Sequence, residues 1–509
     1  MELSIDDILL KKPFRRILPN PVVWTGFSIS TADKISVPDK TSLYRNVGQD
    51  EFLREYFPTG HQILNPAYYP DRLKTDENGK TYIHYVERFT SAWQKVITIK
   101  HLTHLCGNKI DFTNSNPTKI NEQENLMIMF KQGWIKKNME TAWYEAAKST
   151  KITGDAAIAF HLKNNKLGWR VFSYLNDEVL YPVYNSIDGS LKLFARKYKS
   201  YDNEGLELKE FVDVYDSTTV TTYERDMTNG NIIKKIKGAI FGRDKWRITD
   251  TQPHGFDRVP VAYKRCEEGA CWSHVQDSID KYELAVSQLL ENNQTYAFRM
   301  LFLKGESVNI QYDALGQPTA VFGDKDSDAK FLDKADPSSS FKLALEILLQ
   351  NILSGSFTVL PPDVKTGSTL AGVTIKILYS PAVENGIFDS KDYDSFIDDV
   401  VGLFKYGYGV ELSKSSEMEQ LDVRGSINVY VHQNDAEIIQ NLNASVVSKS
   451  LSRETASEIH PYATSSEKQR LEGEIEKEAL STGKIPINQN AEGMNDTNLQ
   501  RQINAEAVE

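Results

Sequence analysis

The sequence is poor in cysteine, with three residues of this type among 509, at Cys106, Cys266 and Cys271. Three cysteines cannot build the disulfide framework of a small secreted domain, and free thiols are typical of a reducing compartment. The first residues, MELSIDDILLKKPFRR, also lack the ordered basic, apolar and small-residue segments of a secretory signal. We therefore expect a protein that is not exported and that occupies the cytoplasm.

Long hydrophobic runs and a surplus of positive charge are also missing. No stretch approaches the roughly 18 apolar residues of a membrane span, and short runs such as Val400 to Phe404 are closely flanked by charges. Lys and Arg number 59 against 70 Asp and Glu, so the formal net charge is −11. Because neutralised phosphates supply most non-specific affinity for nucleic acid, we expect any contact with DNA to be weak or local.

Motifs that would indicate an enzyme are missing from the sequence. It contains no G-x-x-x-x-G-K-[ST] phosphate loop, and STGK at Ser481 lacks the preceding glycine. It also has no G-x-S-x-G elbow and no H-E-x-x-H helix. These absences predict a protein that is not an enzyme and that has no catalytic residues, although an unrecognised hydrolase stays open as an alternative.

Candidate metal ligands are few and poorly spaced. His101, His104 and Cys106 form an H-x-x-H-x-C cluster without a second ligand pair, so a helix end is the better interpretation. Cys266 and Cys271 flank an acidic turn at a spacing wider than a zinc knuckle. The segment DKDSD lacks the Gly and the terminal Glu of a calcium loop. We expect neither a metal nor a cofactor.

The periodicity of the first half predicts a mixture of helix and strand in several domains. We expect helices from about Arg88 to Leu105 and from Glu122 to about Ser149. Strand-like stretches separated by turn signals then predict an antiparallel meander over residues 154–223. The Asp188-Gly189 pair predicts a hairpin near residues 180–198, because a hairpin turn needs residues that tolerate positive φ.

Two striped helices flanking a short β-rich insert are the main feature of the second half. The first is expected over about residues 273–298 and the second over about 338–353, with the insert between them. Their apolar side chains recur at intervals of three and four, a narrow stripe that suits packing against neighbouring long helices. For each single residue, however, burial inside its own subunit is the better interpretation.

The remainder predicts a loop and further helices. Pro361, Pro362 and Gly367 exclude regular helix between Gly355 and Thr369. A helix then begins near residue 370 and resumes beyond a kink at Pro381. After it we expect a strand over residues 426–431, an acidic helical segment over about 434–479 in which Thr464 and Glu467 form a capping box, and a disordered polar tail from residue 481.

The order of these segments resembles the portal proteins of tailed bacteriophages, also called head-to-tail connectors, and their SPP1-like branch most. The segments that carry the resemblance are KITGDAAIAF, EVLYPVYNSIDGSLKLFARKY, HGFDRVPVAYKRCEEG and STLAGVTIKILYSP, followed in order over about residues 100–480. Each segment alone is common, so their order is the specific part. The first hundred residues match no such segment and are assigned by position.

The resemblance implies an α+β multidomain, portal-type architecture with a β-rich wing, a two-helix stem, a small α/β clip, a long kinked helix and a helical crown. The implied parts are the wing at 1–271, the first stem helix at 272–300, the clip at 301–336, the second stem helix at 337–355, the tunnel loop at 356–369, the wing again at 370–432, the crown at 433–480 and a polar tail at 481–509.

The resemblance also implies three sets of functional residues. The tunnel loop facing the DNA channel would comprise Pro362, Asp363, Lys365, Thr366 and Ser368. The clip docking surface would comprise Glu306, Asp324, Lys325, Asp326 and Asp328. The stripe between stems of neighbouring subunits would comprise Val275, Ile279, Tyr282, Val286, Leu289, Phe341, Leu345 and Leu348. For the loop and the acidic residues, a solvated surface is the alternative interpretation.

The implied function is that of a structural subunit in a homo-oligomeric ring, a dodecamer in this family, at one vertex of the capsid in the virion. The ring would be the conduit through which double-stranded DNA is packaged and ejected. Implied partners are the large terminase motor, a head-completion or adaptor protein, and the major capsid and scaffolding proteins, with assembly in the host cytoplasm. Another virion component, such as a minor head or adaptor protein, is the alternative from a different structural class.

Overall fold

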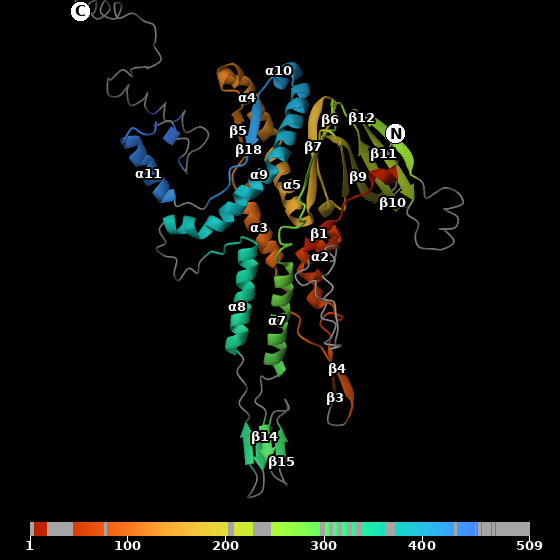
Figure 1. The fold of residues 1–509 in the computed structure, drawn as a ribbon, viewed down its shortest axis with the longest axis vertical. Coiled ribbons are helices and arrows are strands. Elements are labelled where there is room, and N and C mark those ends of the chain that lie inside the picture. Colours follow the sequence, from red (N-terminus) through yellow and green to blue (C-terminus); the bar gives the residue numbers. More distant parts are fainter. Residues whose placement is uncertain are drawn as a thin grey trace, which may run out of the picture. The chain divides into compact units, whose positions relative to one another are not determined.

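The computed structural model describes residues 5–17, 44–75, 79–201, 208–226, 246–295, 301–304, 309–312, 318–322, 328–331, 338–361, 372–431, 435–452, 455–456, 460, 470 and 474 (Figure 1). The chain divides into two compact units, Met1–Pro362 with Leu378–Val431, and Asp363–Ile377 with His432–Glu509. Helices and several small sheets alternate along the chain, which confirms the α+β class. None of the helices in the described ranges combines the length and the apolar content needed to cross a bilayer.

Large aromatic side chains form the main core of the first unit, where helices α4, α5 and α9 meet. Their bounds are Ile120–Lys136 for α4, Met139–Thr153 for α5 and Gly372–Glu411 for α9. The ring centroids of Trp134 and Phe404 lie 5.2 Å apart, and those of Phe130 and Phe404 lie 5.3 Å apart. Each fully buried ring of this kind stabilises the fold by about 1.5–3 kcal/mol.

The single helix expected over residues 122–149 is wrong, because the structure has two helices, α4 and α5. Asn138 separates them in the left-handed region, with φ of 53°, which asparagine tolerates better than most residues. Trp169 and Glu411, which lie far from Asn138 in the sequence, stabilise this break through contacts with Lys137. The Trp169 indole donates a hydrogen bond to the Lys137 carbonyl at 2.7 Å, and the Lys137 ammonium binds Glu411 at 2.6 Å.

The strands expected over residues 154–223 form, but they belong to two antiparallel sheets, so a single meander is wrong. A three-stranded sheet has the order β13-β6-β7, and a five-stranded sheet has the order β12-β11-β10-β9-β8. Strand β6 pairs with its neighbour β7 on one side and with the distant β13 on the other, where Val261 lies opposite Ala159. The bounds are Asp155–Lys163 for β6, Lys166–Ser173 for β7, Val179–Tyr184 for β8, Leu191–Tyr201 for β9, Leu208–Tyr215 for β10, Thr219–Asp226 for β11, Arg247–Pro253 for β12 and Val261–Arg265 for β13.

The hairpin expected near residues 180–198 is confirmed, since β8 pairs with β9 from Val179 opposite Lys197 to Tyr184 opposite Leu191. Gly189 has a φ of 70°, and its amide donates a hydrogen bond to the Asn185 carbonyl at 3.0 Å. The turn therefore spans residues 185–190.

The N-terminal segments pack into a second core of the first unit. Phe14, Phe52 and Trp272 are buried there together with Ile279 of helix α7 and Ile352 of helix α8. The bounds are Ile5–Ile8 for α1, Phe14–Ile17 for β1, Tyr44–Val47 for β2, Gln49–Tyr56 for α2, Pro58–Gly60 for η2, Gln62–Leu64 for η3, Arg72–Thr75 for β3 and Thr81–His84 for β4.

Helix α3 spans Trp93–Cys106, so the helix expected from Arg88 begins later. The residues before Trp93 use their backbone for other contacts. The Phe89 amide donates to the Ser287 hydroxyl and the Ser91 amide donates to the Glu283 carboxylate, both at 2.8 Å. These amides would otherwise lie in the first turn of the expected helix.

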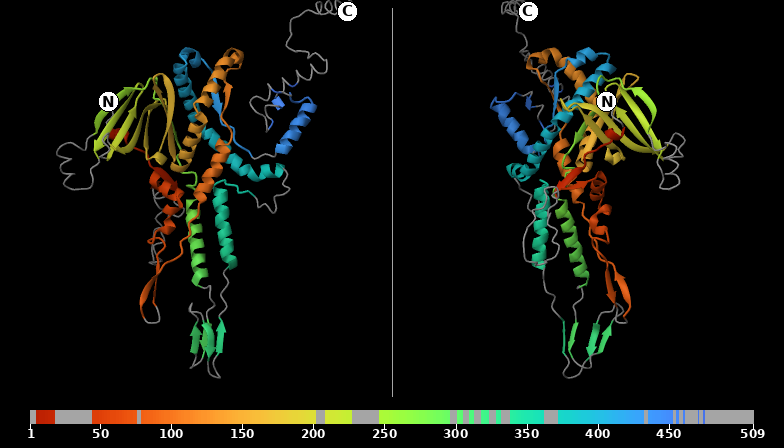
Figure 2. Two further views of the ribbon diagram at one scale, coloured as in Figure 1. Left: turned by 180° about the vertical axis from the view of Figure 1, so that it is seen from behind. Right: turned by 45° about the vertical axis from the view of Figure 1, so that its right-hand side comes forward.

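Helices α7 and α8 lie side by side, and the chain between them contains short strands (Figures 1 and 2). Helix α7 spans Gln276–Thr295 and α8 spans Ser338–Gly355, which confirms the two helices expected there. Strand β14 pairs with β17 and β15 pairs with β16, both antiparallel, which confirms a β-rich insert. The bounds are Leu301–Lys304 for β14, Asn309–Tyr312 for β15, Pro318–Phe322 for β16 and Asp328–Phe331 for β17.

Helix α9 continues without a break through Pro381, so the kink expected there stays a prediction. The strand expected over residues 426–431 is wrong in position, since β18 spans Val423–Ser426 and pairs with β5. The following residues contact the end of α3, where the Tyr430 amide donates to the His104 carbonyl at 2.8 Å. The remaining bounds are Asp111–Asn114 for β5, Pro117–Lys119 for η4, Tyr174–Asn176 for η5 and Ser415–Glu419 for α10.

In the second unit, helix α11 spans Asp435–Val447 and is shorter than the helical segment expected over 434–479. Lys449 has a φ of 57°, which a continuing helix cannot accommodate. Thr464, Glu467 and the tail from residue 481 lie outside the described residues.

Candidate functional surfaces

The apolar stripe of α7 and α8 divides into a buried part and a half-buried part. Val275 and Ile279 are buried in the second core with Ile352, and Tyr282 packs against this core. These side chains contact other parts of their own subunit. Five further members are partly exposed, namely Val286, Leu289, Phe341, Leu345 and Leu348. Their role between subunits stays a prediction.

A second face of α7 is polar and buried, which the sequence analysis did not predict. The Glu283 carboxylate accepts hydrogen bonds from His61 Nδ1 at 2.7 Å and from the Ser91 hydroxyl at 2.7 Å. About two helical turns further, Glu291 binds His84 Nε2 at 2.7 Å. The spacing of Glu283, Ser287 and Glu291 by four residues places them on one face of the helix. That spacing was visible in the sequence, but nothing in it identifies the distant histidines.

A cavity of about 540 Å³ lies between α3, α5, the end of α8 and α9. Lys151 and Asp389 form an ion pair at its wall, with Nζ and Oδ1 2.6 Å apart. Burial and the charge of Lys151 lower the pKa of His101 to about 4, so its ring is neutral and Nε2 donates to the Ser356 carbonyl. Burial raises the pKa of the Cys271 thiol to about 11. A nucleophilic cysteine needs a lowered pKa, so this thiol is not activated.

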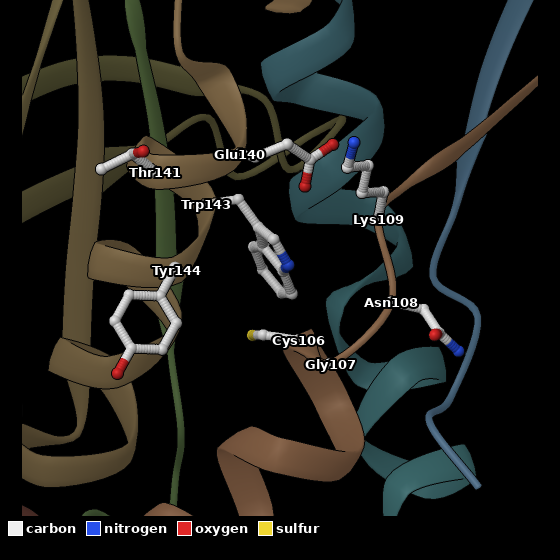
Figure 3. A pocket seen from close by; sticks show the side chains of 8 residues that line it. All are labelled: Cys106, Gly107, Asn108, Lys109, Glu140, Thr141, Trp143 and Tyr144. Atoms are coloured by element: carbon white, nitrogen blue, oxygen red, sulfur yellow. The ribbon is translucent and has the colours of Figure 1, made fainter. Parts of the chain in front are cut away.

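A smaller cavity of about 310 Å³ lies between the end of α3 and the start of α5 (Figure 3). Burial raises the pKa of the Cys106 thiol to about 12, and burial also raises the pKa of Glu140. The Glu140 carboxylate accepts a hydrogen bond from the Trp134 indole at 3.0 Å. Neither group is prepared as a nucleophile, since the thiol stays protonated and the carboxylate is engaged by the indole.

His101, His104 and Cys106 lie on the last turns of α3, as the helix-end interpretation expects. The rings of both histidines point to backbone carbonyls, with His101 bound to Ser356 at 2.7 Å and His104 Nδ1 to Tyr430 at 2.8 Å. In the described ranges, no group of three His, Cys, Asp or Glu side chains is placed to hold a metal ion.

Most of the residues predicted for the tunnel loop and the clip surface lie outside the described residues. This holds for Pro362, Asp363, Lys365, Thr366 and Ser368 and for Glu306, Asp324, Lys325 and Asp326. Asp328 lies in β17, where it is the register partner of Lys304 in β14. These assignments stay predictions.

The described part of the chain therefore shows two contacting helices, α7 and α8, with short antiparallel strand pairs between them in the sequence. Residues 45–480 match the family model described as phage portal protein, SPP1 Gp6-like. Since the match covers most of the chain, the chain belongs to this family of portal proteins and is a structural portal subunit of a bacteriophage virion. A search of curated proteins found none that matches it.

The match confirms the resemblance and its SPP1-like branch. It also begins at residue 45, so it extends well beyond the segments that carried the resemblance, which began near residue 100. The alternatives of a minor head protein, an adaptor or a hydrolase find no support in it.

Proposed function

We propose that copies of this chain form a closed ring, a dodecamer, at one capsid vertex and that double-stranded DNA passes through the ring during packaging and ejection. The family match over residues 45–480 carries this proposal. The two contacting helices α7 and α8 support it, because they present side chains that are only half-buried within one subunit. A ring of identical subunits needs such surfaces on two different sides of each copy.

The parts of the chain take the roles that the family implies. Residues 1–271 and 370–432 form the wing, 272–300 and 337–355 the stem helices, 301–336 the clip, 356–369 the tunnel loop and 433–480 the crown. Two short strand pairs between α7 and α8 support the clip, since two-stranded ladders are marginal alone and gain stability from neighbours. The Phe89 and Ser91 amides donate hydrogen bonds to Ser287 and Glu283 of α7, which supports a further role for the wing segment in holding the proposed stem.

The proposed channel needs a wall along which a polyanion slides. A strongly basic wall would bind DNA tightly, because many counterions would be released at once. A chain of net charge −11 lacks this surplus of positive charge and its non-specific affinity for DNA. Within the tunnel loop, Lys365 and Thr366 would contact phosphates transiently, with Asp363 nearby to weaken the attraction.

The ring would also be the docking platform of the capsid vertex. The acidic residues of the clip, Glu306, Asp324, Asp326 and Asp328, would face the large terminase during packaging and the head-completion or adaptor protein afterwards. The wing would contact the major capsid and scaffolding proteins while the capsid assembles in the host cytoplasm.

Deleting residues 362–368 tests the proposed channel. The deletion spares Thr358, whose hydroxyl is 2.9 Å from that of Ser356, and so leaves the described end of α8 in place. In a phage lacking its own portal gene, we expect the intact chain to restore nuclease-protected DNA in capsids. The variant that lacks residues 362–368 should still form rings but should restore little nuclease-protected DNA, because the loop would no longer contact the moving duplex.

A same-length replacement of residues 362–368 by Gly and Ser is the matched control for chain length. Full packaging by the deletion would remove the role assigned to the loop. Failure of the intact chain to restore any packaged DNA would contradict the proposed function itself.

A further inference from the structure

The β3–β4 hairpin is attached to α7 through one of its faces. His84 Nε2 lies 2.7 Å from the Glu291 carboxylate, and Arg72 reaches the same oxygen at 4.0 Å. Arg72 and His84 are register partners, so they project from the same face of the two strands. Glu291 is buried on α7, which fixes this face of the hairpin toward that helix.

The opposite face of the hairpin is apolar and exposed. Leu73 and Ile83 are register partners with exposed fractions of 74% and 54%, and Tyr85, two residues further, is 72% exposed. Alternation along a strand places Leu73 and Ile83 away from α7. An isolated two-stranded hairpin is marginal in water, and exposed apolar side chains that adjoin one another indicate a contact surface.

Helix α8 has a matching apolar face on its far side. Phe341, Leu345 and Leu348 are half-buried, and Ile352 on the same side is buried in the core with residues of α7. Leu343 is two residues from both Phe341 and Leu345, and at about 100° per residue this turns it away from α7. Leu343 is 57% exposed and Ile347, one turn later, is 48% exposed.

The hairpin and α8 therefore flank α7 on different sides, and each has an apolar face turned outward. Figure 1 and both views of Figure 2 show the hairpin and α8 on either side of α7. One subunit cannot join these two faces to each other, because α7 stands between them. Two unlike faces on opposite flanks are what a head-to-tail contact between identical copies requires.

We propose that the outer face of the β3–β4 hairpin in one subunit packs against the Leu343 and Ile347 face of α8 in the next subunit. This inference rests on the proposed ring. A second copy is the occupant because it covers both faces at once and repeats around a closed ring, whereas any other single partner would cover one face and leave the other exposed. The β3–β4 hairpin, which belongs to the N-terminal segment of one subunit, thus links that subunit to helix α8 of the next.

Cysteine cross-linking of the full chain tests this contact. The double variant Ile83→Cys with Ile347→Cys is treated with a short bismaleimide after the assembly state has been examined by electron microscopy. Because each copy contributes one cysteine to each neighbour, we expect a ladder of covalent multimers up to the complete ring on a denaturing gel. Each single variant should give at most a dimer.

The three native cysteines provide little background. Burial raises the pKa of the Cys106 thiol to about 12 and that of Cys271 to about 11, and it also raises the pKa of Cys266, so the reactive thiolates are scarce. A matched control pairs Ile83→Cys with Ile187→Cys, an exposed isoleucine in the β8–β9 turn. This control should give no ladder.

A charged side chain at position 83 provides a second, independent readout of the contact. Ile83→Asp should shift the population from rings toward free subunits, while Ile187→Asp leaves the rings unchanged. Intact rings that show no ladder and that tolerate Ile83→Asp would overturn this contact and leave the ring itself standing, with the hairpin free for a capsid or tail protein. Absence of rings from the unmodified chain would instead remove the proposed function, and this inference with it.

Discussion

Glu283 and His61 form a buried ion pair between α7 and the N-terminal segment. The two ring nitrogens of His61 both face acceptors, the Glu283 carboxylate at 2.7 Å and the Glu55 carbonyl at 2.7 Å. A proton on each nitrogen is needed to donate to both acceptors at once, so this geometry favours the imidazolium form. Burial alone would lower the pKa of His61, but the hydrogen bond and charge of Glu283 outweigh it and raise the pKa above 6.5.

This pair predicts a pH dependence of stability. A raised pKa in the folded state means that the contribution of His61 is fully present below pH 6.5 and is lost as the pH rises through the folded pKa. We expect the thermal midpoint of the intact chain to fall over that range at fixed protein concentration. His61→Gln should be less stable at low pH and should lack this part of the slope.

The measurement is a series of thermal scans of the intact chain and of His61→Gln, from below pH 6.5 to a pH above the folded pKa of His61, at one ionic strength throughout. Parallel curves for the intact chain and His61→Gln would show that the pair does not stabilise the fold.

At the scale of elements, the contact between α7 and α8 supports the proposed stem. Ile279 of α7 and Ile352 of α8 are fully buried in the same core as Trp272. Ile279→Ala should therefore destabilise the first unit by about 2–5 kcal/mol, because it removes buried methyl groups and leaves a cavity. Leu290→Ala on the same helix should change stability by less than about 0.5 kcal/mol, since Leu290 is exposed.

Urea unfolding of the two variants and the intact chain, in the same assembly state, measures this difference. Equal midpoints for Ile279→Ala and Leu290→Ala would contradict the packing of α7 into its own subunit.

Elements set by local pattern were predictable from the sequence. The stripes of α7 and α8 and the Gly189 turn of the β8–β9 hairpin depend on neighbouring residues, and their positions agree with the expectation. The strands of residues 155–226 were also visible, but their division into two sheets depends on the pairing of β6 with β13 about a hundred residues away. No local pattern encodes a partner at that distance.

Breaks that tertiary contacts stabilise were missed for the same reason. The α4–α5 break at Asn138 depends on Trp169 and Glu411, and the late start of α3 depends on Ser287 and Glu283. At the candidate surfaces, the apolar stripe was predictable, whereas the histidines that bind the polar face of α7 were not.

For the whole molecule, the family match places this subunit in a phage portal, and the charge of the chain suits a conduit more than a DNA clamp. Every subunit of a closed ring meets its neighbours through two different faces. In the proposed ring these are the outer faces of strands β3 and β4 and of α8, and both elements contact the same helix, α7.

Electron microscopy of the purified full chain in negative stain tests the central claim most directly. We predict closed rings of uniform size with a hole along the axis. In these rings the exposed faces of the hairpin and of α8 would be covered by the neighbouring subunits. A monodisperse monomer that persists at high concentration would contradict the account.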